Sequence, residues 1–411
     1  MKFLHKMDSN IAKFLKEEEQ RQNETINLIP SENLVSKNVL LALGSVLTNK
    51  YAEGKSHQRY YFGNKIVDKI EDETKSLVYK VFGISNNDWG VNVQPYSGSI
   101  ANLAAYLGVL ELGDKVLAMS LEHGGHLTHG HKVSFTGKLF KFEHYGVGKD
   151  GLLDYELILD QAKKFKPKLI VAGATAYPRI IDFKKFKEIA DAVGAKLMVD
   201  LSHIAGLVIG GAHPSPLPYA DIVTTTTHKT LRGPRGAIII SKQELSENID
   251  KAVFPGLQGG PQLHTIAAIG ISLEEASQSN FKEYAEQVVK NSKALASELT
   301  NLGFSVVSGG TDNHLMLVDV TPLKLTGDEA GKKLEEVGIV VNKNMIPFDP
   351  RKPWDPSGIR IGMPAVTTRG MKEEEMKKIA ELIHKTLQNK EDLGKIREEV
   401  KSLASKFVFN G

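Results

Sequence analysis

The sequence predicts an α/β fold in which a doubly wound, mostly parallel sheet is followed by a smaller α+β domain. Two observations support this prediction. From about residue 90, short apolar runs alternate with amphipathic helical stretches, which is the pattern of a parallel sheet covered on both faces. Beyond about residue 280, long helical stretches are mixed with a few short apolar runs. A chain of 411 residues is long enough for two packed units.

Seven segments have the length and apolar character of strands in the expected sheet. Helical patterns, such as Phe183–Val193, separate several of them. Ligands of such sheets bind beyond the carboxyl ends of the strands, so polar residues that follow these segments are candidates for a site. The expected strands are Trp89–Pro95, Lys115–Met119, Leu139–Phe142, Lys168–Ala172, Lys196–Asp200, Ile222–Thr226 and Ala237–Ser241.

The rest of the chain is expected to form an N-terminal arm and a second domain. The arm, residues 1–48, is too short to fold alone, so we expect it to pack on a neighbouring subunit. The large domain is expected at 49–272 and the small C-terminal domain at 273–411. Further helices are expected over 66–82, from 262 into the 270s, over 281–302 and from 372.

The composition excludes several classes of function. The chain has no cysteine, which rules out disulfides, thiolate metal sites and a cysteine nucleophile. A formal net charge of +3 is close to neutral for this length and gives no argument for nucleic-acid binding. No stretch matches a signal peptide or a membrane span, so we expect a cytoplasmic protein.

Lys229 and Asp200 are candidates for binding a carbonyl cofactor. Lys229 follows a threonine-rich run, and Arg232 and Arg235 beside it would disfavour its protonation, so its amine could form a Schiff base. Asp200 ends an apolar strand and could hold a protonated pyridine nitrogen. A solvated loop lysine and a helix N-cap are the ordinary alternatives. Their spacing of 29 positions fits one helix and one strand, which would place both side chains at one sheet edge.

Two segments suggest contacts to a phosphate and to a flat ring. Ser97, Gly98 and Ser99 open a helix whose free N–H groups would suit a phosphate, although serine capping is common. Residues 121–131 contain four histidines, but their spacing matches no metal-binding pair, and we expect no metal. His126 is interpreted as a ring stacked on a flat cofactor, and the other histidines as structural.

Arg360 is the candidate for binding a carboxylate. It alternates with Ile359 and Ile361 on a short expected strand, so it should point away from both. Its planar guanidinium suits a substrate carboxylate. An internal ion pair with an aspartate or glutamate explains the same pattern equally well.

Taken together, these segments resemble the serine hydroxymethyltransferases, a family of fold-type-I enzymes dependent on pyridoxal 5'-phosphate. The resemblance rests on TNKYAEG, HGGHLTHG, TTTTHKTLRGPRG, FPGLQGGP, TDNHLMLVDV and GIRIG, which occur in the family's order between about residues 27 and 370. TTTTHKTLRGPRG is the most specific match. The resemblance implies reversible conversion of L-serine and tetrahydrofolate, or another reduced pterin, to glycine and the methylene-pterin by Cα–Cβ cleavage.

The resemblance also implies a role for each matching residue. The catalytic residues would be Lys229, which would hold the cofactor as a Schiff base, Glu53, the proton-transfer carboxyl, and His126, Asp200 and His203. The cofactor would contact Tyr51, Ser97, Gly98, Ser99, His126, Thr175, Asp200, His203, Thr226, His228, Lys229, Arg235, Gly259 and Gly260. The substrate would contact Ser31, Tyr61 and Arg360, and the pterin would contact Glu53, Tyr60, Leu121, Gly125, Leu127 and Asn344. His203 would lie on the cofactor's phenolic side. Tyr51 and Gln258–Gly260 would come from a partner subunit, which implies a homodimer or a tetramer.

The chain departs from the family pattern at Lys55–Gln58, Phe62, Tyr96 and Met363, and two other functions remain open. A folate-independent threonine or β-hydroxy-amino-acid aldolase or transaldolase would need the lysine, the aspartate and the arginine but no pterin pocket. A non-catalytic RNA- or protein-binding module would need none of them. Reaction rates with and without a reduced pterin separate the first from the leading function, and a visible absorbance band excludes the second.

Overall fold

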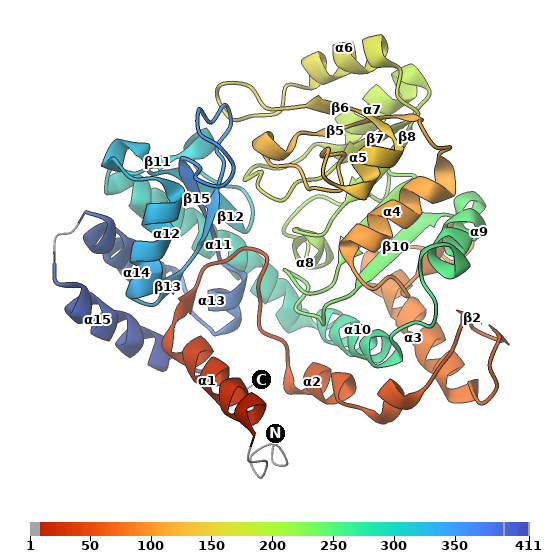
Figure 1. The fold of residues 1–411 in the computed structure, drawn as a ribbon, viewed down its shortest axis with the longest axis horizontal. Helices are drawn as coiled ribbons and strands as arrows, with labels where there is room; N and C mark the ends of the chain where they lie inside the picture. Colours follow the sequence, from red (N-terminus) through yellow and green to blue (C-terminus); the bar gives the residue numbers. More distant parts are fainter. Residues whose placement is uncertain (1–8, 389–390, 410–411) are drawn as a thin grey trace.

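The computed structural model of the chain describes residues 9–388 and 391–409. Figure 1 shows two lobes, one built around a seven-stranded sheet and the other around a four-stranded sheet. The order of the larger sheet is β4-β10-β9-β8-β7-β5-β6. Strands β9, β8, β7, β5 and β6 are mutually parallel, and β10 is antiparallel to both of its neighbours. The α/β class and the mostly parallel sheet expected from the sequence are confirmed.

The strands of this sheet lie close to the segments expected. Their bounds are β4 (Trp89–Asn92), β5 (Lys115–Met119), β6 (Lys141–Tyr145), β7 (Leu169–Ala172), β8 (Lys196–Asp200), β9 (Ile222–Thr226) and β10 (Ala237–Lys242). Strand β4 ends earlier than expected because the Asn92 side chain accepts a hydrogen bond from the Gln94 amide (2.9 Å) and turns the chain. Strand β6 begins later because Phe135–Leu139 forms the short helix α5.

Both faces of the large sheet are covered at its centre, which explains why central strands such as β7 and β8 are almost continuously apolar. Alternate residues of β5 belong to different hydrophobic clusters. Val116 and Ala118 pack against the helices on one face of the sheet, and Leu117 and Met119 pack against the helices on the other face. The first face is covered by α4 (Gly98–Val109) and α9 (Gln243–Lys251). The second is covered by α6 (Tyr155–Phe165), α7 (Phe183–Val193) and α8 (Ala205–Ile209).

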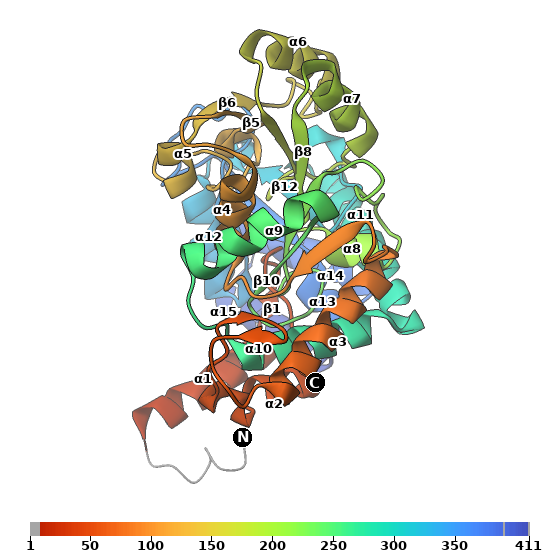
Figure 2. The same cartoon turned by 90° about the vertical axis from the view of Figure 1, so that its right-hand side faces the viewer.

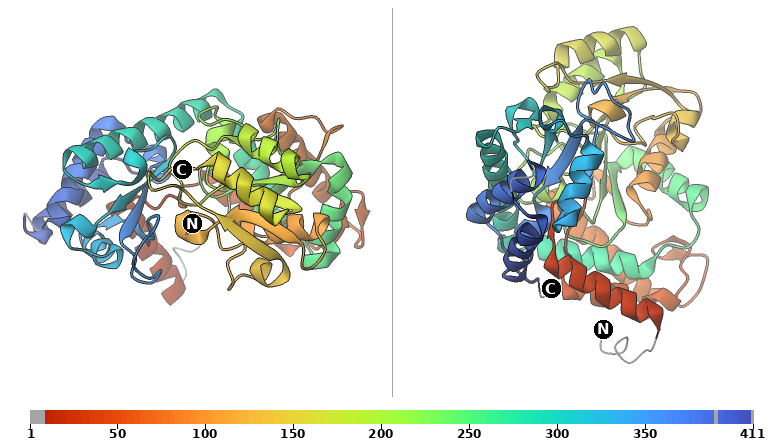
Figure 3. Two further views of the ribbon diagram at one scale, coloured as in Figure 1. Left: turned by 90° about the horizontal axis from the view of Figure 1, so that it is seen from above. Right: turned by 60° about the vertical axis from the view of Figure 1, so that its left-hand side comes forward.

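Residues 9–50 pack on both lobes of their own chain. Helix α1 (Asn10–Glu24) lies against α15 (Leu393–Ser405), as Figures 1 and 3 show. Strand β1 (Ile26–Asn27) pairs in parallel with β13 (Ile339–Val340). Three further elements form a layer under the large sheet: α10 contacts both α2 and α3, and α3 and α10 lie side by side in Figure 2. Their bounds are α2 (Lys37–Leu43), α3 (Lys65–Phe82) and α10 (Leu263–Ala276).

The smaller sheet has the order β11-β12-β15-β14, and all its neighbours are antiparallel. Its bounds are β11 (Ser305–Val306), β12 (Leu315–Asp319), β14 (Asn342–Asn344) and β15 (Gly358–Gly362). The helices packed around it are α11 (Ser279–Asn301), α12 (Gly327–Glu336), α13 (Pro364–Thr368) and α14 (Glu373–Leu387). A two-stranded hairpin of β2 (Gly54–Lys55) and β3 (Gln58–Arg59) stands apart from both sheets. The domain boundary expected at residue 272 falls within α10 and stays a prediction.

In the part of the chain that the structure describes, no helix is both long enough and apolar enough to cross a membrane.

Candidate active site

A cavity of about 280 Å³ lies at the carboxyl ends of β8 and β9, where the sequence predicts a site. Most of the residues predicted to contact a cofactor line it. They are Ser97, Gly98, Ser99, His126, Thr175, Asp200, His203, Thr226, His228, Lys229 and Arg235, together with the predicted substrate contact Ser31. The cavity is also lined by Asn102, His129 and Ser202, for which the sequence analysis predicted no contact to a cofactor.

Lys229 lies in this cavity with a weakened affinity for protons. Its Nζ donates a hydrogen bond to Thr226 Oγ1 (2.9 Å). Burial lowers the pKa of Lys229 to about 8; the charges of Arg360 and Arg235 act in the same direction, and Asp200 opposes them. A substantial fraction of the amine is therefore neutral near physiological pH, as a nucleophile requires.

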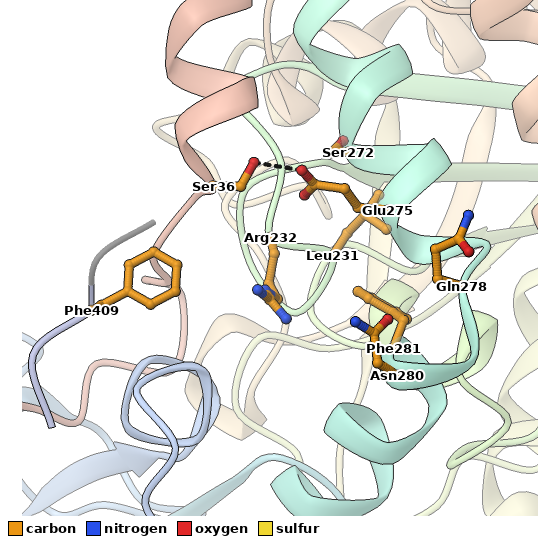
Figure 4. A pocket seen from close by; sticks show the side chains of 9 residues that line it. All are labelled: Ser36, Leu231, Arg232, Ser272, Glu275, Gln278, Asn280, Phe281 and Phe409. Carbon is orange, nitrogen blue, oxygen red and sulfur yellow. Dashed lines mark hydrogen bonds between the residues drawn. The ribbon is translucent and has the colours of Figure 1, made fainter.

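The effect expected from Arg232 was wrong. Its backbone is left-handed (φ 60°), and its guanidinium lies 4.9 Å from the ring centroid of Tyr284. Figure 4 shows Arg232 in a second cavity of about 280 Å³, where the Ser36 hydroxyl donates a hydrogen bond to Glu275 (2.6 Å). Arg232 lines this cavity and not the one that contains Lys229.

The backbone at Lys229 is held by residues from both ends of the chain. The side-chain amide of Asn33 donates hydrogen bonds to Lys229 O (2.9 Å) and to the hydroxyl of Tyr284 (2.8 Å). The hydroxyl of Thr368 donates in turn to Asn33 Oδ1 (2.7 Å). The lysine loop thus depends on contacts that span most of the sequence.

Asp200 is buried but has three hydrogen-bond donors. Asn102 Nδ2 (2.9 Å) and His129 Nε2 (3.3 Å) donate to Oδ2, and the Ser202 amide donates to Oδ1 (3.0 Å). Burial would raise the pKa of Asp200, but the hydrogen bonds from His129 and Ser202 are among the causes that outweigh it and hold the pKa well below its ordinary value. The carboxylate therefore stays ionised.

His129, expected to be structural, lies within hydrogen-bond distance of Asp200 and so helps to orient that carboxylate. Its Nδ1 accepts a hydrogen bond from the His126 amide (3.2 Å), so its own proton lies on Nε2, from which it donates a hydrogen bond to Asp200. His126 accepts a hydrogen bond at Nδ1 from the Thr128 amide (3.2 Å), and burial lowers its pKa to about 4. His126 thus presents a neutral ring. Among the described residues, no three histidine or acidic side chains are grouped as metal ligands.

The beginning of α4 has the features of an anion site. Ser97 caps the helix through its hydroxyl, and a Cβ on Gly98 would lie only 2.6 Å from Thr226 Cγ2, so bare backbone approaches the strand end here. His228 Nδ1 is buried without a hydrogen-bond partner in the described part of the chain, and Arg235 adds a positive charge. Free N–H groups, a cation and an unpaired ring nitrogen together fit a bound phosphate.

Arg360 points away from the fully buried Ile359 and Ile361, as expected. Its Nη1 donates to Thr175 O (2.7 Å) and its Nε to Asn342 Oδ1 (3.1 Å). Among the described residues it has no carboxylate partner, so the internal ion pair is not formed. Burial lowers its pKa to about 10. A buried guanidinium without a carboxylate suits an anionic ligand.

His203 is paired with a histidine that sequence reasoning did not single out. His203 Nδ1 lies 3.0 Å from His314 Nε2, and both side chains are buried. His314 belongs to the TDNH segment before β12, a motif that supported the family resemblance but received no role.

Six predicted residues form a separate cluster, which we call the aromatic cluster. It consists of Tyr51, Glu53, Tyr60, Tyr61, Gly259 and Gly260, and none of them lines the Lys229 cavity. The Tyr61 ring lies edge-on to Tyr51 (5.0 Å between centroids) and to Tyr60 (5.4 Å). A Cβ on Gly259 would lie 3.2 Å from Glu53 Oε1. The three tyrosines are exposed, by 51%, 80% and 42% for Tyr51, Tyr60 and Tyr61, so this cluster faces outward.

The four remaining predicted pterin contacts also lie outside the cavity lining. They are Leu121, Gly125, Leu127 and Asn344. A family model described as Serine hydroxymethyltransferase matches residues 4–383 of the chain, which is nearly its whole length.

Proposed function

The chain belongs to the serine hydroxymethyltransferase family, and from this membership we propose how its residues perform the family's reaction. It is an enzyme dependent on pyridoxal 5'-phosphate that carries out the serine hydroxymethyltransferase reaction of one-carbon metabolism, with a folate as cosubstrate. One observation supports the proposed roles above all others. A single cavity combines a lysine amine of lowered pKa, an ionised aspartate and a helix N-terminus.

These residues fit the cofactor group by group. The amine of Lys229 would hold its carbonyl carbon, and Asp200 its pyridine nitrogen. The N-terminus of α4, with His228 and Arg235, would hold the phosphate. The neutral ring of His126 would lie on the cofactor's face. Thr175, Thr226 and His203 would complete the contacts, with His203 on the phenolic side. When bound, pyridoxal phosphate supplies an electron sink for the charge that develops at Cα.

The chain's own residues would bind and orient the amino acid. Arg360 has donors left for the carboxylate of serine, and a two-point grip there fixes which Cα bond faces the cavity. Ser31 and His203 would hold the rest of the substrate. Lys229, with a pKa of about 8, can give up and take back a proton at its Nζ near neutral pH.

We propose further that a second copy of the chain completes each site, in a homodimer. The aromatic cluster is exposed and separate from the Lys229 cavity of its own chain, although its predicted roles require contact with cofactor and substrate. Helix α1 also exposes Ile11, Phe14 and Leu15. In the dimer, the cluster would supply Tyr51 and the Gly259–Gly260 backbone to the phosphate.

The same cluster would supply the groups that act on the serine hydroxyl and the pterin. Glu53 would carry the proton at the serine hydroxyl, and Tyr61 would close over the substrate. The reduced pterin, tetrahydrofolate or a relative, would contact Tyr60 and the four residues Leu121, Gly125, Leu127 and Asn344. A cytoplasmic location remains part of the proposal, and cell fractionation tests it.

Subunit complementation tests the shared site. Lys229→Ala and Tyr51→Ala should each be inactive, but mixed dimers restore one intact site, so a refolded mixture should regain about a quarter of wild-type activity. A mixture of Lys229→Ala with Asp200→Asn should stay inactive, because both residues belong to the cavity of one chain. Mixed dimers of the first pair that form but remain inactive would contradict the shared site.

A further inference from the structure

A buried pair of histidines joins the two lobes at the Lys229 cavity. His203 follows β8 of the large sheet and lines the cavity, and His314 directly precedes β12 of the small sheet and has no exposed surface. Their facing nitrogens, His203 Nδ1 and His314 Nε2, are 3.0 Å apart. This distance is that of a hydrogen bond, so one of the two nitrogens carries the proton.

Both rings are neutral, which couples their tautomers. Burial, together with the positive charges of Lys229 and Arg360, holds the pKa of His203 well below its ordinary value. The same causes lower the pKa of His314 to about 3. A neutral imidazole has one N–H and one bare nitrogen, so the direction of the shared hydrogen bond fixes the state of all four nitrogens.

The surroundings of His314 decide which of the two rings donates the shared hydrogen bond. Its Nδ1 is buried and has no hydrogen-bond partner among the described residues. If His314 accepted at Nε2, its own proton would lie on Nδ1 as a buried N–H without an acceptor, which is the rarer defect in protein interiors. If His314 donates from Nε2, Nδ1 is bare. His203 then accepts at Nδ1 and carries its proton on Nε2.

The turn that holds His314 is rigidly bonded. Thr311 Oγ1 donates to Leu315 O (2.6 Å), and Asn313 Oδ1 accepts from the Leu315 amide (3.1 Å). The Met363 amide donates to His314 O (2.9 Å) next to the end of β15. These bonds fix the backbone at His314, and its buried ring is held against His203 by their shared hydrogen bond.

We propose that His314 is a positioning residue that fixes the tautomer of His203, so that His203 presents an Nε2–H donor to the cavity. The inference rests on the proposed function, in which His203 faces the phenolic oxygen of the cofactor. A donor fixed in advance suits an anionic oxygen at that place.

The small sheet thus carries two functional contacts. His314 leads into β12, and Arg360 lies on β15, its partner strand. Arg360 reaches across to Thr175 O, and His314 reaches across to His203. The substrate clamp and the residue that orients a cofactor contact therefore belong to one rigid element.

The direct test is the tautomer of His203 in the full-length protein, measured by long-range ¹H–¹⁵N correlation with ¹⁵N-labelled histidine and assigned with His203→Asn. We expect Nε2 of His203 to carry the proton before any cofactor is added. Protonation at Nδ1 would overturn the proposal, whatever the enzyme's activity. This measurement needs no His314 variant, so it holds even if such a variant folds poorly.

Variants of His314 test whether this residue fixes the tautomer of His203 and thereby supports cofactor binding. His314→Phe should release the tautomer of His203 and weaken pyridoxal-phosphate binding roughly 10- to 100-fold, the effect of losing a hydrogen bond to a charged group. His314→Gln, whose amide can donate from nearly the same place, should restore most of the affinity. His213→Gln, a change at another buried histidine, should alter neither the tautomer of His203 nor the affinity for the cofactor. If a folded His314→Phe variant kept both the His203 tautomer and the pyridoxal-phosphate affinity of the wild type, the positioning role of His314 would be refuted. If the wild type bound no cofactor, the proposed function would fail while the tautomer result still stood.

Discussion

Arg360 tests the proposed substrate clamp most directly, because its existing contacts can be counted. Of five N–H groups, one goes to Thr175 O and one to Asn342 Oδ1, which leaves three for a ligand. Burial lowers its pKa from 12.5 to about 10, a cost of roughly 3 kcal/mol at about 1.4 kcal/mol per pKa unit. A carboxylate bound to the free donors would offset this cost.

Arg360→Ala should therefore weaken glycine binding by about 2–5 kcal/mol, or roughly 30- to 4,000-fold, because the buried carboxylate loses its partner. Cofactor binding should change little, since Arg360 does not line the Lys229 cavity. Arg360→Lys keeps the positive charge but not the planar, two-point geometry of the guanidinium, so its glycine affinity should lie between those of the wild type and Arg360→Ala. Arg351→Ala, a change at an exposed arginine, is the control.

Calorimetric titration of glycine into the cofactor-loaded protein measures the first effect, and a separate cofactor titration measures the second. Equal glycine affinity in the wild type and a folded Arg360→Ala variant would show that the arginine is structural. A parallel loss of cofactor and glycine affinity would show that the variant disturbs the whole cavity, and the clamp would lose its support.

Three other predictions concern Lys229 and the proton-transfer carboxyl. Lys229→Ala should bind cofactor but retain none after borohydride reduction and denaturation, because the amine is the attachment point; label that stays on the variant would refute this. Glu53→Gln should lower folate-dependent serine cleavage roughly 10²–10⁴-fold and spare folate-free cleavage of β-phenylserine. Glu32, a carboxyl within the cavity of its own chain, is the rival, and if Glu32→Gln produces that loss instead, the role of Glu53 is wrong. Lys229→Met should stabilise the cofactor-free protein by about 3 kcal/mol below pH 8, since burial lowers the pKa of Lys229 from 10.5 to about 8. Between pH 8 and 10.5 Lys229 is protonated in the unfolded chain and neutral in the folded one, so wild-type stability rises with pH and the variant's advantage disappears near pH 10.5. Chemical denaturation that shows the same difference in free energy of unfolding at every pH would contradict this.

The parts of the site that follow sheet geometry could be predicted from the sequence. Strands β8 and β9 have the bounds expected: β8 ends at the polar Asp200, and β9 continues through buried threonines, whose branched side chains favour strands. Parallel strands end at one edge, so the spacing of Asp200 and Lys229 was enough to place both in one cavity. The capping of α4 by Ser97 also followed from local chemistry.

The parts that depend on distant contacts could not be predicted. Asn102 looks like any polar residue within a helix, although its position one turn after Gly98 puts it on the same face, which was the available signal. The left-handed backbone of Arg232, which turns its side chain toward Tyr284, has no local signature. The pairing of His203 with His314 joins residues 111 positions apart, and only the packed lobes bring them together.

The hydrogen bonds of Asn33 have a consequence for how the enzyme is made. Asn33 is 196 residues from Lys229 and 335 from Thr368, and it bonds to both. A ribosome exposes the chain from its N-terminus, so a nascent chain that ends near residue 300 already contains the lysine, the aspartate and helix α4. It lacks Thr368, which holds the Asn33 side chain that bonds to Lys229 O, and it also lacks His314. Productive capture of the cofactor is thus expected only once translation of the chain is nearly complete.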